Sequence, residues 1–572
     1  MSIARPTLAG LMQEAANPAT AASGSFSLGQ AYRARREYDE AIEALQRATS
    51  LDPSHPEWFF ALLDALMCRS RWGEALDAVR HGLALRYDVG AAIRLARLYA
   101  RLGDSAACTT TILEVLRHTQ DAFEPFAILC DQLASELTAG EIEVHVAGMM
   151  PAMRSTSAPP PTPTPMRIGL AQVLESRGRH DEARDCWMTA LRDAPADARV
   201  LSGAANIHAL LGDIDEATRI FDRALALHPD NLEVVTLCVE FLVHTGRLSA
   251  LWDGRIRKPR PPFNRSGAGA ALPVRASLGV RFPKLAPYWD GEQPLDGKTV
   301  LMECCGGYGD IFQICRFAAL FKERGASVIL DVPTRVVDLL RSMKTADDVV
   351  GVFDPCRPFD YQCRAAFPTF FVEWTPQWMH AITPYIGVEA ARRRAWSDRF
   401  DRRRLNVGII WKTTAEACRN LHIFRSVPLD AFRPLAGVPG VTLYGLQVGP
   451  GAEEVTADTR SWLVTNLDAE TRDFREAAAA IDALDVIVSA DAGIAHLAGA
   501  IGKTCFVLLP KHASWRWMTA APDFAANGNA SGNGTLWYPS MRVFQQNIAG
   551  DWSTPMRQIA DNIRSLASAT AA

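Results

Sequence analysis

The first 250 residues repeat one pattern of small, apolar and polar positions. A small side chain recurs five residues beyond each turn, at spacings of 34 and 33 residues and, after a break, of 34: Ala41, Ala75, Cys108, Ala183 and Ala217. Three of the turn positions are Gly103, Gly178 and Gly212. Small residues at this period are typical of paired helices that cross closely. Such pairs bury their apolar faces only by stacking, so the pattern predicts an α-helical solenoid over residues 1–250.

The details of this pattern resemble the tetratricopeptide repeat. The first helix of each unit carries an aromatic residue or Leu, and a proline follows the second helix at Pro53 and Pro229. Five repeats can be recognised, and residues 123–150 are a candidate for a degenerate sixth. The resemblance implies a superhelix whose concave groove binds a peptide or another protein. The alternative is a solenoid that only packs on the rest of the chain or dimerises.

Two irregular segments interrupt the periodic regions. Residues 151–165 (PAMRSTSAPPPTPTP) are so rich in proline that they predict an extended linker or loop rather than a helix. Residues 251–287 are rich in Arg, Lys, Pro and Gly and predict a solvated connector, with binding of an acidic partner as the alternative.

Beyond the connector, short β-branched runs alternate with helical patterns. The runs are ASVILDV, NVGIIW, VTLYGLQ, DVIVS and TCFVLLP. Strands that alternate with helices predict a parallel, doubly wound α/β sheet. We expect one α/β half over residues 288–400 and a second half over residues 401–572.

Two strand–loop–helix units carry the candidate chemistry. The first has an apolar strand, Thr299–Cys305, then Gly306, Gly307 and Gly309, then Asp310, which we expect to open a helix that runs to Gly325. The second has a strand, Leu484–Ala490, then Asp491, Ala492 and Gly493, then a helix that contains His496 and ends at Gly502. A strand that enters a helix through glycines points backbone N–H groups at an anion such as a nucleotide phosphate. Two such units predict two nucleotide-binding folds that face one cleft.

The composition removes several classes of function. The chain has 60 Lys and Arg residues against 64 Asp and Glu residues, so it lacks the excess of positive charge that attracts nucleic acids. The sequence opens with no apolar signal segment, and no stretch approaches the length of a membrane span, which predicts a cytoplasmic protein. The 12 cysteines include no C-x-x-C pair, so we expect reduced thiols and no metal site.

The order of motifs after residue 285 resembles one bacterial glycosyltransferase family. The motifs are YWDG, GKTVLM, the glycine loop with Asp310, VGIIWK, RSVPLDAF, LYGLQVGP, SADAGIAHLAGAIGKTCFVLLP, WRW and WYP. With the repeats in front, the chain is similar to the bacterial tetratricopeptide-repeat glycosyltransferases, whose catalytic half is similar to the lipopolysaccharide heptosyltransferases. The resemblance implies a GT-B fold of two Rossmann-like halves. It also implies an inverting, metal-independent transfer, without a cofactor, from a nucleotide-sugar donor bound mainly by the C-terminal half.

Asp310 is the candidate catalytic base. Inverting transfer needs a group that takes the proton of the acceptor hydroxyl, and a carboxylate within about 3 Å can do so. In the family, the matching aspartate of the heptosyltransferases is taken as the base. The alternative is a helix cap, in which the Asp310 carboxylate only accepts backbone N–H bonds and contributes about 1 kcal/mol of stability.

Three polar residues of the C-terminal half are candidates for binding the donor. Lys412 ends a strand at the carboxyl edge of the sheet, where open α/β sheets bind ligands, and Arg425 lies in the RSVP motif. Either cation can stabilise the charge that develops on the donor phosphate, and a solvated Lys412 is the alternative. Gln447 follows another strand and can hydrogen bond a nucleobase or ribose. Residues 418–424 depart from the polar run that is usual in the family.

The segment from Asp491 to His496 is a further candidate donor site. Asp491 can accept hydrogen bonds from sugar or ribose hydroxyls, and the N–H groups of Ala492 and Gly493 can bind phosphates at the helix start. The family usually has Thr where Ala492 stands, so one hydroxyl contact is absent. His496 can donate to a phosphate oxygen or satisfy a neighbouring carbonyl, and the helix dipole disfavours its charged form.

These features together favour a glycosyltransferase that modifies Ser or Thr of a protein acceptor recruited by the repeats. Some bacterial proteins of this layout glycosylate flagellins with nonulosonic acids, so flagellin is the hypothetical acceptor. The alternatives are transfer to a glycan or lipopolysaccharide, and a repeat scaffold without catalysis. The joint presence of Asp310, Lys412 and Asp491 argues against the scaffold.

Overall fold

The computed structural model divides the chain into two compact units, residues 1–207 and 208–572. It describes residues 8–571 except 36, 70, 119–122, 134–136, 138–140, 143–162, 252–285, 290, 305, 352–356, 365–371, 414–424, 450, 456–461, 463–464, 472, 514 and 518–532. Most of the connector at 251–287, and the segment at 418–424, therefore lie outside the described residues. None of the described helices is long and apolar enough to cross a membrane.

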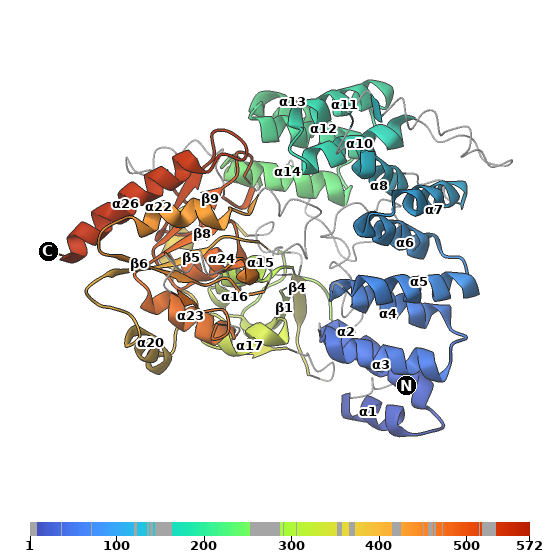
Figure 1. The fold of residues 1–572 in the computed structure, drawn as a ribbon, viewed down its shortest axis with the longest axis horizontal. Coiled ribbons are helices and arrows are strands. Elements are labelled where there is room, and N and C mark those ends of the chain that lie inside the picture. The colour runs from blue at the N-terminus through green and yellow to red at the C-terminus, as the bar shows by residue number, and fades with distance from the viewer. Residues whose placement is uncertain are drawn as a thin grey trace. The chain divides into compact units, whose positions relative to one another are not determined.

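The repeat region consists of helices that pair with their neighbours in sequence (Figure 1). They are α1 (Leu8–Ala16), α2 (Ala21–Arg35), α3 (Tyr38–Leu51), α4 (Pro56–Cys68), α5 (Trp72–Leu85), α6 (Val89–Leu102), α7 (Ser105–His118), α8 (Phe123–Leu133), α10 (Pro163–Ser176), α11 (His180–Asp193), α12 (Ala198–Leu211), α13 (Ile214–Leu227) and α14 (Leu232–His244). Helix α2 packs with α3, α4 with α5, α6 with α7 and α10 with α11, which is the pairing that the period predicts. The boundary between the units lies within α12, so α13 and α14 belong to the second unit.

The small residues of the repeat pattern are buried within the helix pairs. Each is the fourth residue of the second helix of its pair, and all five are fully buried: Ala41, Ala75, Cys108, Ala183 and Ala217. The turn glycines before three of them have φ of 79°, 74° and 86°, a left-handed conformation that other residues rarely adopt: Gly103, Gly178 and Gly212. The prediction of a helical repeat from these positions is confirmed.

The expectation for the proline-rich segment is wrong at its C-terminal end. Helix α10 begins at Pro163 and includes Pro165, although we expected residues 151–165 to be non-helical. Prolines are tolerated in a first turn because the N–H groups there have no intrahelical partner. Of the candidate sixth repeat, α8 is described, and it packs on both α7 and α10, so it continues the stack across the break in the pattern.

The first α/β half contains a four-stranded parallel sheet. Its strands are β1 (Thr299–Glu303), β2 (Ser327–Asp331), β3 (Asp348–Val350) and β4 (Tyr361–Arg364), in the order β3-β2-β1-β4. Its helices are α15 (Tyr308–Ile314), α16 (Ala318–Lys322) and α17 (Thr334–Leu340), with the 3₁₀ turn η3 (Cys315–Phe317) between the first two. This strand order, 3-2-1-4 in chain order, is the beginning of the Rossmann arrangement.

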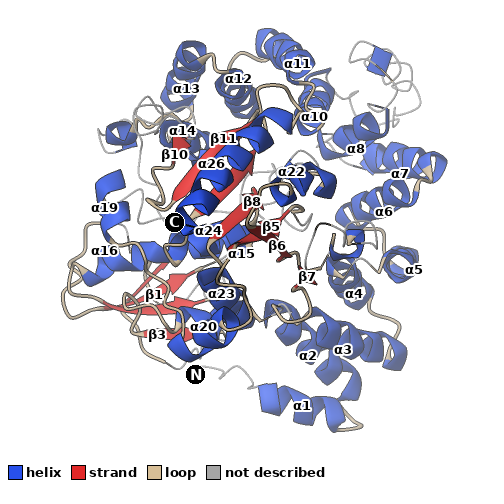
Figure 2. Ribbon diagram, turned by 60° about the vertical axis from the view of Figure 1, so that its left-hand side comes forward, coloured by secondary structure: helices blue, strands red, loops and turns tan. Residues whose placement is uncertain are grey.

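The second half contains a seven-stranded sheet (Figure 2). Its strands are β5 (Leu405–Ile410), β6 (Val441–Gly445), β7 (Thr465–Asn466), β8 (Val486–Ala490), β9 (Cys505–Leu509), β10 (Asn533–Gly534) and β11 (Met541–Gln545). Only β10 is antiparallel to its neighbour, and the six parallel strands follow the order β7-β6-β5-β8-β9-β11. That order is 3-2-1-4-5-6, the full Rossmann order. The predicted fold class, a helical repeat solenoid with two Rossmann-like halves, is confirmed.

Helices cover the second sheet and close its core. They are α22 (Arg433–Ala436), α23 (Phe474–Ala483), α24 (Gly493–Ala500) and the C-terminal helix α26 (Ser553–Ala571), with the 3₁₀ turns η4 (Leu429–Phe432), η5 (Ala452–Glu454) and η7 (Trp515–Trp517). Every residue of β5 is buried, as a central parallel strand requires. Apolar residues of α26, among them Met556, Ile559 and Ile563, belong to the same core cluster as β5 and β6.

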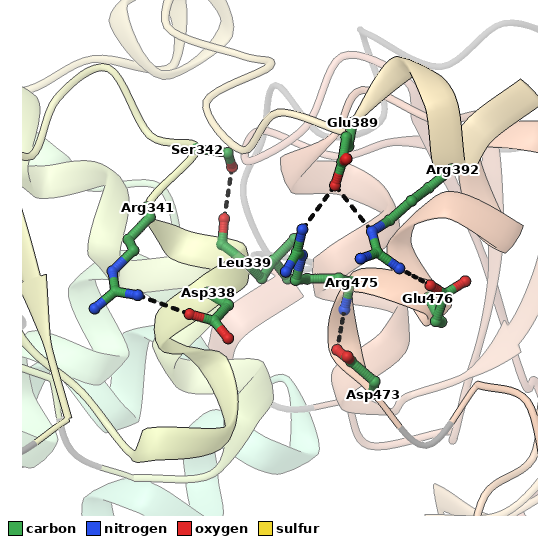
Figure 3. Close-up of polar contacts among 9 residues, drawn as sticks. All are labelled: Asp338, Leu339, Arg341, Ser342, Glu389, Arg392, Asp473, Arg475 and Glu476. Carbon is green, nitrogen blue, oxygen red and sulfur yellow. Dashed lines mark hydrogen bonds and ion pairs between the residues drawn. The ribbon is translucent and has the colours of Figure 1, made fainter.

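An ionic cluster attaches the segment between the halves to the second half (Figure 3). This segment contains α19 (Pro376–Ala381) and α20 (Ala390–Ser397). Arg392 on α20 pairs with Glu389 and with Glu476 on α23, and Glu389 also accepts from Arg475 at 2.7 Å. The indole N–H of Trp396 donates to Glu476 at 2.9 Å. Helix α17 of the first half also packs on α23, so these contacts lie where the two halves meet.

Candidate functional site

The two glycine loops meet where the two halves face each other. Helix α15, which follows the first loop, packs against α24, which follows the second. A Cβ atom placed on Gly309 would lie 3.0 Å from the Cα atom of Gly493 and 3.0 Å from Cδ2 of His496. Carbon atoms prefer 3.5–4.0 Å, so a side chain at position 309 would push these neighbours away by a few tenths of an ångström. This contact supports the sequence prediction that the two strand–loop–helix units, around Asp310 and Asp491, face one another.

The structure corrects the boundaries of the first strand–loop–helix unit, which contains Asp310. Strand β1 ends at Glu303, whereas we expected a strand to Cys305, and the helix begins at Tyr308 rather than at Asp310. The expected single helix to Gly325 is divided by η3 into α15 and α16. In the second strand–loop–helix unit, β8 begins at Val486 rather than Leu484. Helix α24 ends at Ala500, close to the expected Gly502.

Asp310 is the third residue of α15 and both of its carboxylate oxygens have partners. Oδ2 accepts from the Gly307 N–H at 3.2 Å, which is the capping contact that the sequence offered as an alternative. Oδ1 accepts from Nε of Arg516 at 2.7 Å, a contact that capping alone does not explain. Burial alone would raise the pKa of Asp310, but the charge and hydrogen bond of Arg516 outweigh it and hold this pKa below its usual value. The carboxylate is therefore ionised at neutral pH.

Arg516 is the main residue of the site that the sequence did not reveal. It lies on η7, 206 positions from Asp310, and its side chain is 26% exposed. Asp310 is the leading group that raises the pKa of Arg516 against the opposing effect of burial. The only signal for it was its place in the WRW motif between two tryptophans. Of these, Trp517 is fully buried, which places it in the core rather than on an exposed sugar-binding surface.

His496 is buried against the same turn. Its ring stacks on that of Trp517 with centroids 4.9 Å apart, and its Nδ1 lies 3.1 Å from the hydroxyl of Tyr538. Burial lowers the pKa of His496 to about 4, although Asp491 and Asp310 oppose this. The imidazole is therefore neutral at physiological pH, and burial is the main cause. Its Nδ1 partner is a hydroxyl, whereas we considered a carbonyl or a phosphate oxygen.

A buried arginine joins the two halves beside this site. Arg316 on η3 is fully buried and donates to the Trp537 carbonyl at 2.7 Å and to the Tyr385 hydroxyl at 2.8 Å. Its guanidinium carbon lies 4.4 Å from the centre of the Tyr538 ring. A buried guanidinium is tolerated only when its donors are satisfied, and here oxygens of both halves contribute. Arg316 therefore holds the halves in the arrangement that brings Gly309 to Gly493.

The donor-side candidates lie at the carboxyl ends of neighbouring strands. Lys412 follows β5 and Asp491 follows β8, and the strand order reverses between these two strands. Open α/β sheets bind ligands at such a switch point. Gln447 follows β6, is buried, and accepts from the Lys412 N–H at 2.9 Å through Oε1. The Lys412 ammonium pairs with Glu454, and the Lys412 side chain is 37% exposed.

Asp491 lies at the start of α24 with an unsatisfied oxygen. The residue is 3% exposed, and its Oδ2 has no hydrogen-bond partner among the residues that the structure describes. Nη1 of Arg425 lies 3.6 Å from this oxygen, which allows attraction but not a hydrogen bond. Ala492 is the N-cap residue of α24 and makes no side-chain capping bond, so the first N–H groups of Gly493 and its neighbours point toward the loop.

The structure thus arranges the predicted residues in three neighbouring groups. Gly309, Asp310, Gly493 and His496 surround the contact between the halves, together with Gly306 and Gly307 of the same loop. Arg425 faces Asp491, and Lys412 contacts Gln447. In the described part of the chain, no cluster of three or more His, Cys, Asp or Glu side chains could hold a metal ion.

Comparisons with known proteins match both regions of the chain. Family models described as tetratricopeptide repeat match residues 22–55, 89–113 and 168–231. Protein FlbA of Caulobacter vibrioides (strain ATCC 19089 / CIP 103742 / CB 15) is 26% identical over 452 residues, which cover 70% of this chain and 72% of that protein. The chain therefore carries tetratricopeptide repeats, as the sequence predicted.

Solved structures show weaker likenesses. The ADP-heptose LPS heptosyltransferase II of E. coli has a TM-score of 0.34 and 13% identity, covering 48% of this chain and 100% of that chain. The tetratricopeptide-repeat protein YrrB has a TM-score of 0.21 and 13% identity, covering 41% and 100%. At these scores, the fold assignment rests on the helix pairing and on the strand orders of the two sheets. The chain therefore combines tetratricopeptide repeats with two Rossmann-type sheets.

Proposed function

We propose that this protein is an inverting GT-B glycosyltransferase that moves a sugar from a nucleotide-sugar donor to a Ser or Thr hydroxyl of a protein acceptor. The observation that carries this proposal is the contact between the glycine loops, which brings Asp310 of one half to the start of α24 in the other. A base from one half and a phosphate-binding helix start from the other are what a transfer between two bound substrates needs.

In this reaction, Asp310 takes the proton of the acceptor hydroxyl. The hydroxyl oxygen forms a bond to the anomeric carbon while the bond from that carbon to the phosphate oxygen breaks on the opposite face. The proton passes to the Asp310 carboxylate, and the nucleotide leaves with the bonding pair. Because Arg516 donates to the same carboxylate at 2.7 Å, the base is fully available only when this guanidinium shifts toward another anion. The phosphate of the donor can supply that anion.

The donor binds mainly to the second half in this proposal. Oδ2 of Asp491, which has Arg425 at 3.6 Å but no hydrogen bond from the described residues, accepts one from a sugar or ribose hydroxyl, because a buried acceptor left without a donor destabilises the site. The first N–H groups of α24, at Gly493, and the cation of Arg425 bind phosphate oxygens. Lys412 joins them when its ammonium leaves Glu454. No metal ion is part of this proposal.

The repeats recruit the protein acceptor. Paired helices in a solenoid form extended surfaces suited to peptides or proteins. We propose a bacterial flagellin as the acceptor and a nonulosonic acid as the sugar, on the basis of the sequence resemblance, and we place the reaction in the cytoplasm.

Replacement of Asp310 tests the proposal. The variant Asp310→Asn keeps the shape of the side chain, but its amide has a single acceptor oxygen, so it can keep the bond from Arg516 or the bond from Gly307 and not both. We expect a loss of turnover of roughly 10²–10⁴-fold, the usual contribution of a general base, with donor affinity unchanged. The matched control is Asp338→Asn, because Asp338 lies on α17 of the same half and is exposed beside Arg341. Near-normal turnover of Asp310→Asn would leave Asp310 as a helix cap.

A further inference from the structure

A row of charged side chains crosses the first helices of three successive repeats. Nη2 of Arg33 on α2 donates to Oδ2 of Asp64 on α4 at 2.9 Å, and Nη1 of Arg94 on α6 donates to Oδ1 of the same carboxylate at 2.5 Å. All three residues belong to the first compact unit. One carboxylate therefore lies between two guanidinium groups and connects three helices that the second helix of each pair separates along the chain.

This row is partly open to solvent and has donors to spare. The side chains of Arg33, Asp64 and Arg94 are 26%, 33% and 27% exposed. Nε of Arg94 has no hydrogen-bond partner in the described part of the chain. A guanidinium has five N–H donors, so one carboxylate cannot satisfy two arginines. Arg97 and Arg101 follow about one and two turns beyond Arg94 on the same side of α6.

Charge is divided unequally between the two kinds of helix in this region. The first helices α2, α4 and α6 carry five arginines and two acidic residues, whereas the second helices α3, α5 and α7 carry three arginines and six acidic residues. Ion pairs that only fastened neighbouring helices would need one arginine for each carboxylate. The excess of positive charge on the first helices instead suits a negatively charged partner.

We propose that the face defined by Arg33, Asp64 and Arg94 binds an acidic segment of the protein acceptor. In the free protein, Asp64 holds the two guanidinium groups in place. A carboxylate of the acceptor then bonds the same guanidinium groups, whose planar forks suit this geometry, and Arg97 and Arg101 extend the positive charge along the bound segment. This inference rests on the proposed recruitment of a protein acceptor by the repeats, and it adds the place and the charge of the contact.

The first test measures the binding of two fluorescent nonapeptides to the full-length protein by anisotropy. One peptide is rich in Glu and Asp, and the other has Gln and Asn at the same positions. We expect the acidic peptide to bind at least about 10-fold more tightly, and this preference to disappear as NaCl rises from about 0.05 to 0.5 M. Equal affinities for the two peptides, or tighter binding of a single-stranded RNA of the same charge, would overturn the proposal.

Two substitutions with opposite expected effects separate binding from a structural role. Arg94→Gln removes a charged donor and should weaken binding of the acidic peptide by about 10-fold. Asp64→Asn removes the carboxylate that competes with the peptide, so it should tighten binding by about 3-fold although it disturbs the same ion pairs. Arg47→Gln is the matched control, because Arg47 is exposed on the second helix α3. If Asp64→Asn bound the peptide no more tightly than Arg47→Gln, the proposal would be wrong.

The peptide measurements need neither donor nor turnover, so they remain decisive even if the proposed transfer reaction fails. With transfer, the double variant Arg33→Gln and Arg94→Gln should raise KM for the protein acceptor by about 10-fold or more. Its kcat and its KM for the donor should stay constant, because the row lies on the repeats and not on the α/β halves. An unchanged KM for the acceptor would show that this face does not recruit it.

Discussion

Replacing Gly309 by alanine tests whether the close approach of the two glycine loops matters for catalysis. Gly309 is the second residue of α15, and alanine in a helix is ordinarily more stable than glycine by roughly 0.5–1 kcal/mol. The added methyl group would, however, lie 3.0 Å from the Cα atom of Gly493 and from Cδ2 of His496. These contacts are tighter than ordinary contacts of carbon, so the loop at Gly493 and the His496 ring must move by a few tenths of an ångström.

This movement has two expected consequences. Overpacking of this kind costs about 1–3 kcal/mol, which exceeds the gain in helix propensity, so the melting temperature should fall. A misplacement of 1 Å between reacting groups can lower a rate by about 10²-fold, so a shift of a few tenths of an ångström should lower it by less. We expect kcat/KM of Gly309→Ala to fall by about 3- to 10-fold, with donor affinity little changed because the donor contacts lie on the second half.

The measurement combines steady-state kinetics, calorimetric donor binding and thermal melting on three proteins. Gly437→Ala is the matched control, since φ is −74° there and its Cβ would lie 3.5 Å from the nearest atom, an ordinary contact. If Gly309→Ala were as active and as stable as Gly437→Ala, the contact between the loops would not be required for catalysis.

Two further predictions concern pH and the repeat region. In the folded protein, the pKa of His496 is about 4, whereas an ordinary histidine has a pKa of 6.5. As the pH falls from 6.5 to 4, His496 therefore gains a proton only in the unfolded state. Protonation favours the unfolded state, so folding stability is lost over this pH window. Urea unfolding of His496→Gln should show a shallower loss, by up to about 3 kcal/mol, and an equal loss in both proteins would contradict the burial argument. A fragment of residues 208–572, which keeps α14 on η7, should melt higher than a fragment of residues 280–572 and bind donor as the full chain does. Both fragments should modify a protein acceptor more slowly than the full chain, because tethering by the repeats raises the local acceptor concentration to about millimolar. If the fragments and the full chain modified the acceptor at equal rates, the solenoid would be purely structural.

Local features of the fold could be predicted from the sequence because their causes are local. The small residues at a period near 34 identified the helix pairs, and β-branched runs identified all five named strands, including β5 and β8. The ends of helices and strands were predicted less well. The expected strand ends at Cys305 and Leu484 and the expected absence of a helix at the prolines of α10 were wrong, because residue propensities alone do not fix where an element begins or ends. Turn chemistry outside these patterns, such as η3 within the expected long helix, also left no clear signal.

Long-range pairing could not be predicted from the sequence. The bond between Asp310 and Arg516 joins residues 206 positions apart, and the pair of Lys412 with Glu454 depends on how η5 folds back on β5. The glycine motifs showed that Asp310 and Asp491 lie at strand ends, but the contact between Gly309 and Gly493 depends on the packing of the halves. The packing of α14 on η7, which brings a repeat helix to the turn that carries Arg516, also left no signal in the sequence.

Intact-mass analysis of the acceptor tests the central claim most directly. Flagellin and other secreted filament proteins from the native host would be weighed with the gene intact, deleted, and restored as the wild type or as Asp310→Asn. The account predicts that one acceptor carries a sugar mass on Ser or Thr with the wild-type gene, and that this mass is absent after deletion and with Asp310→Asn. An acceptor population whose masses are identical in all four strains would contradict a protein glycosyltransferase and return the chain to the alternatives of glycan transfer or a scaffold.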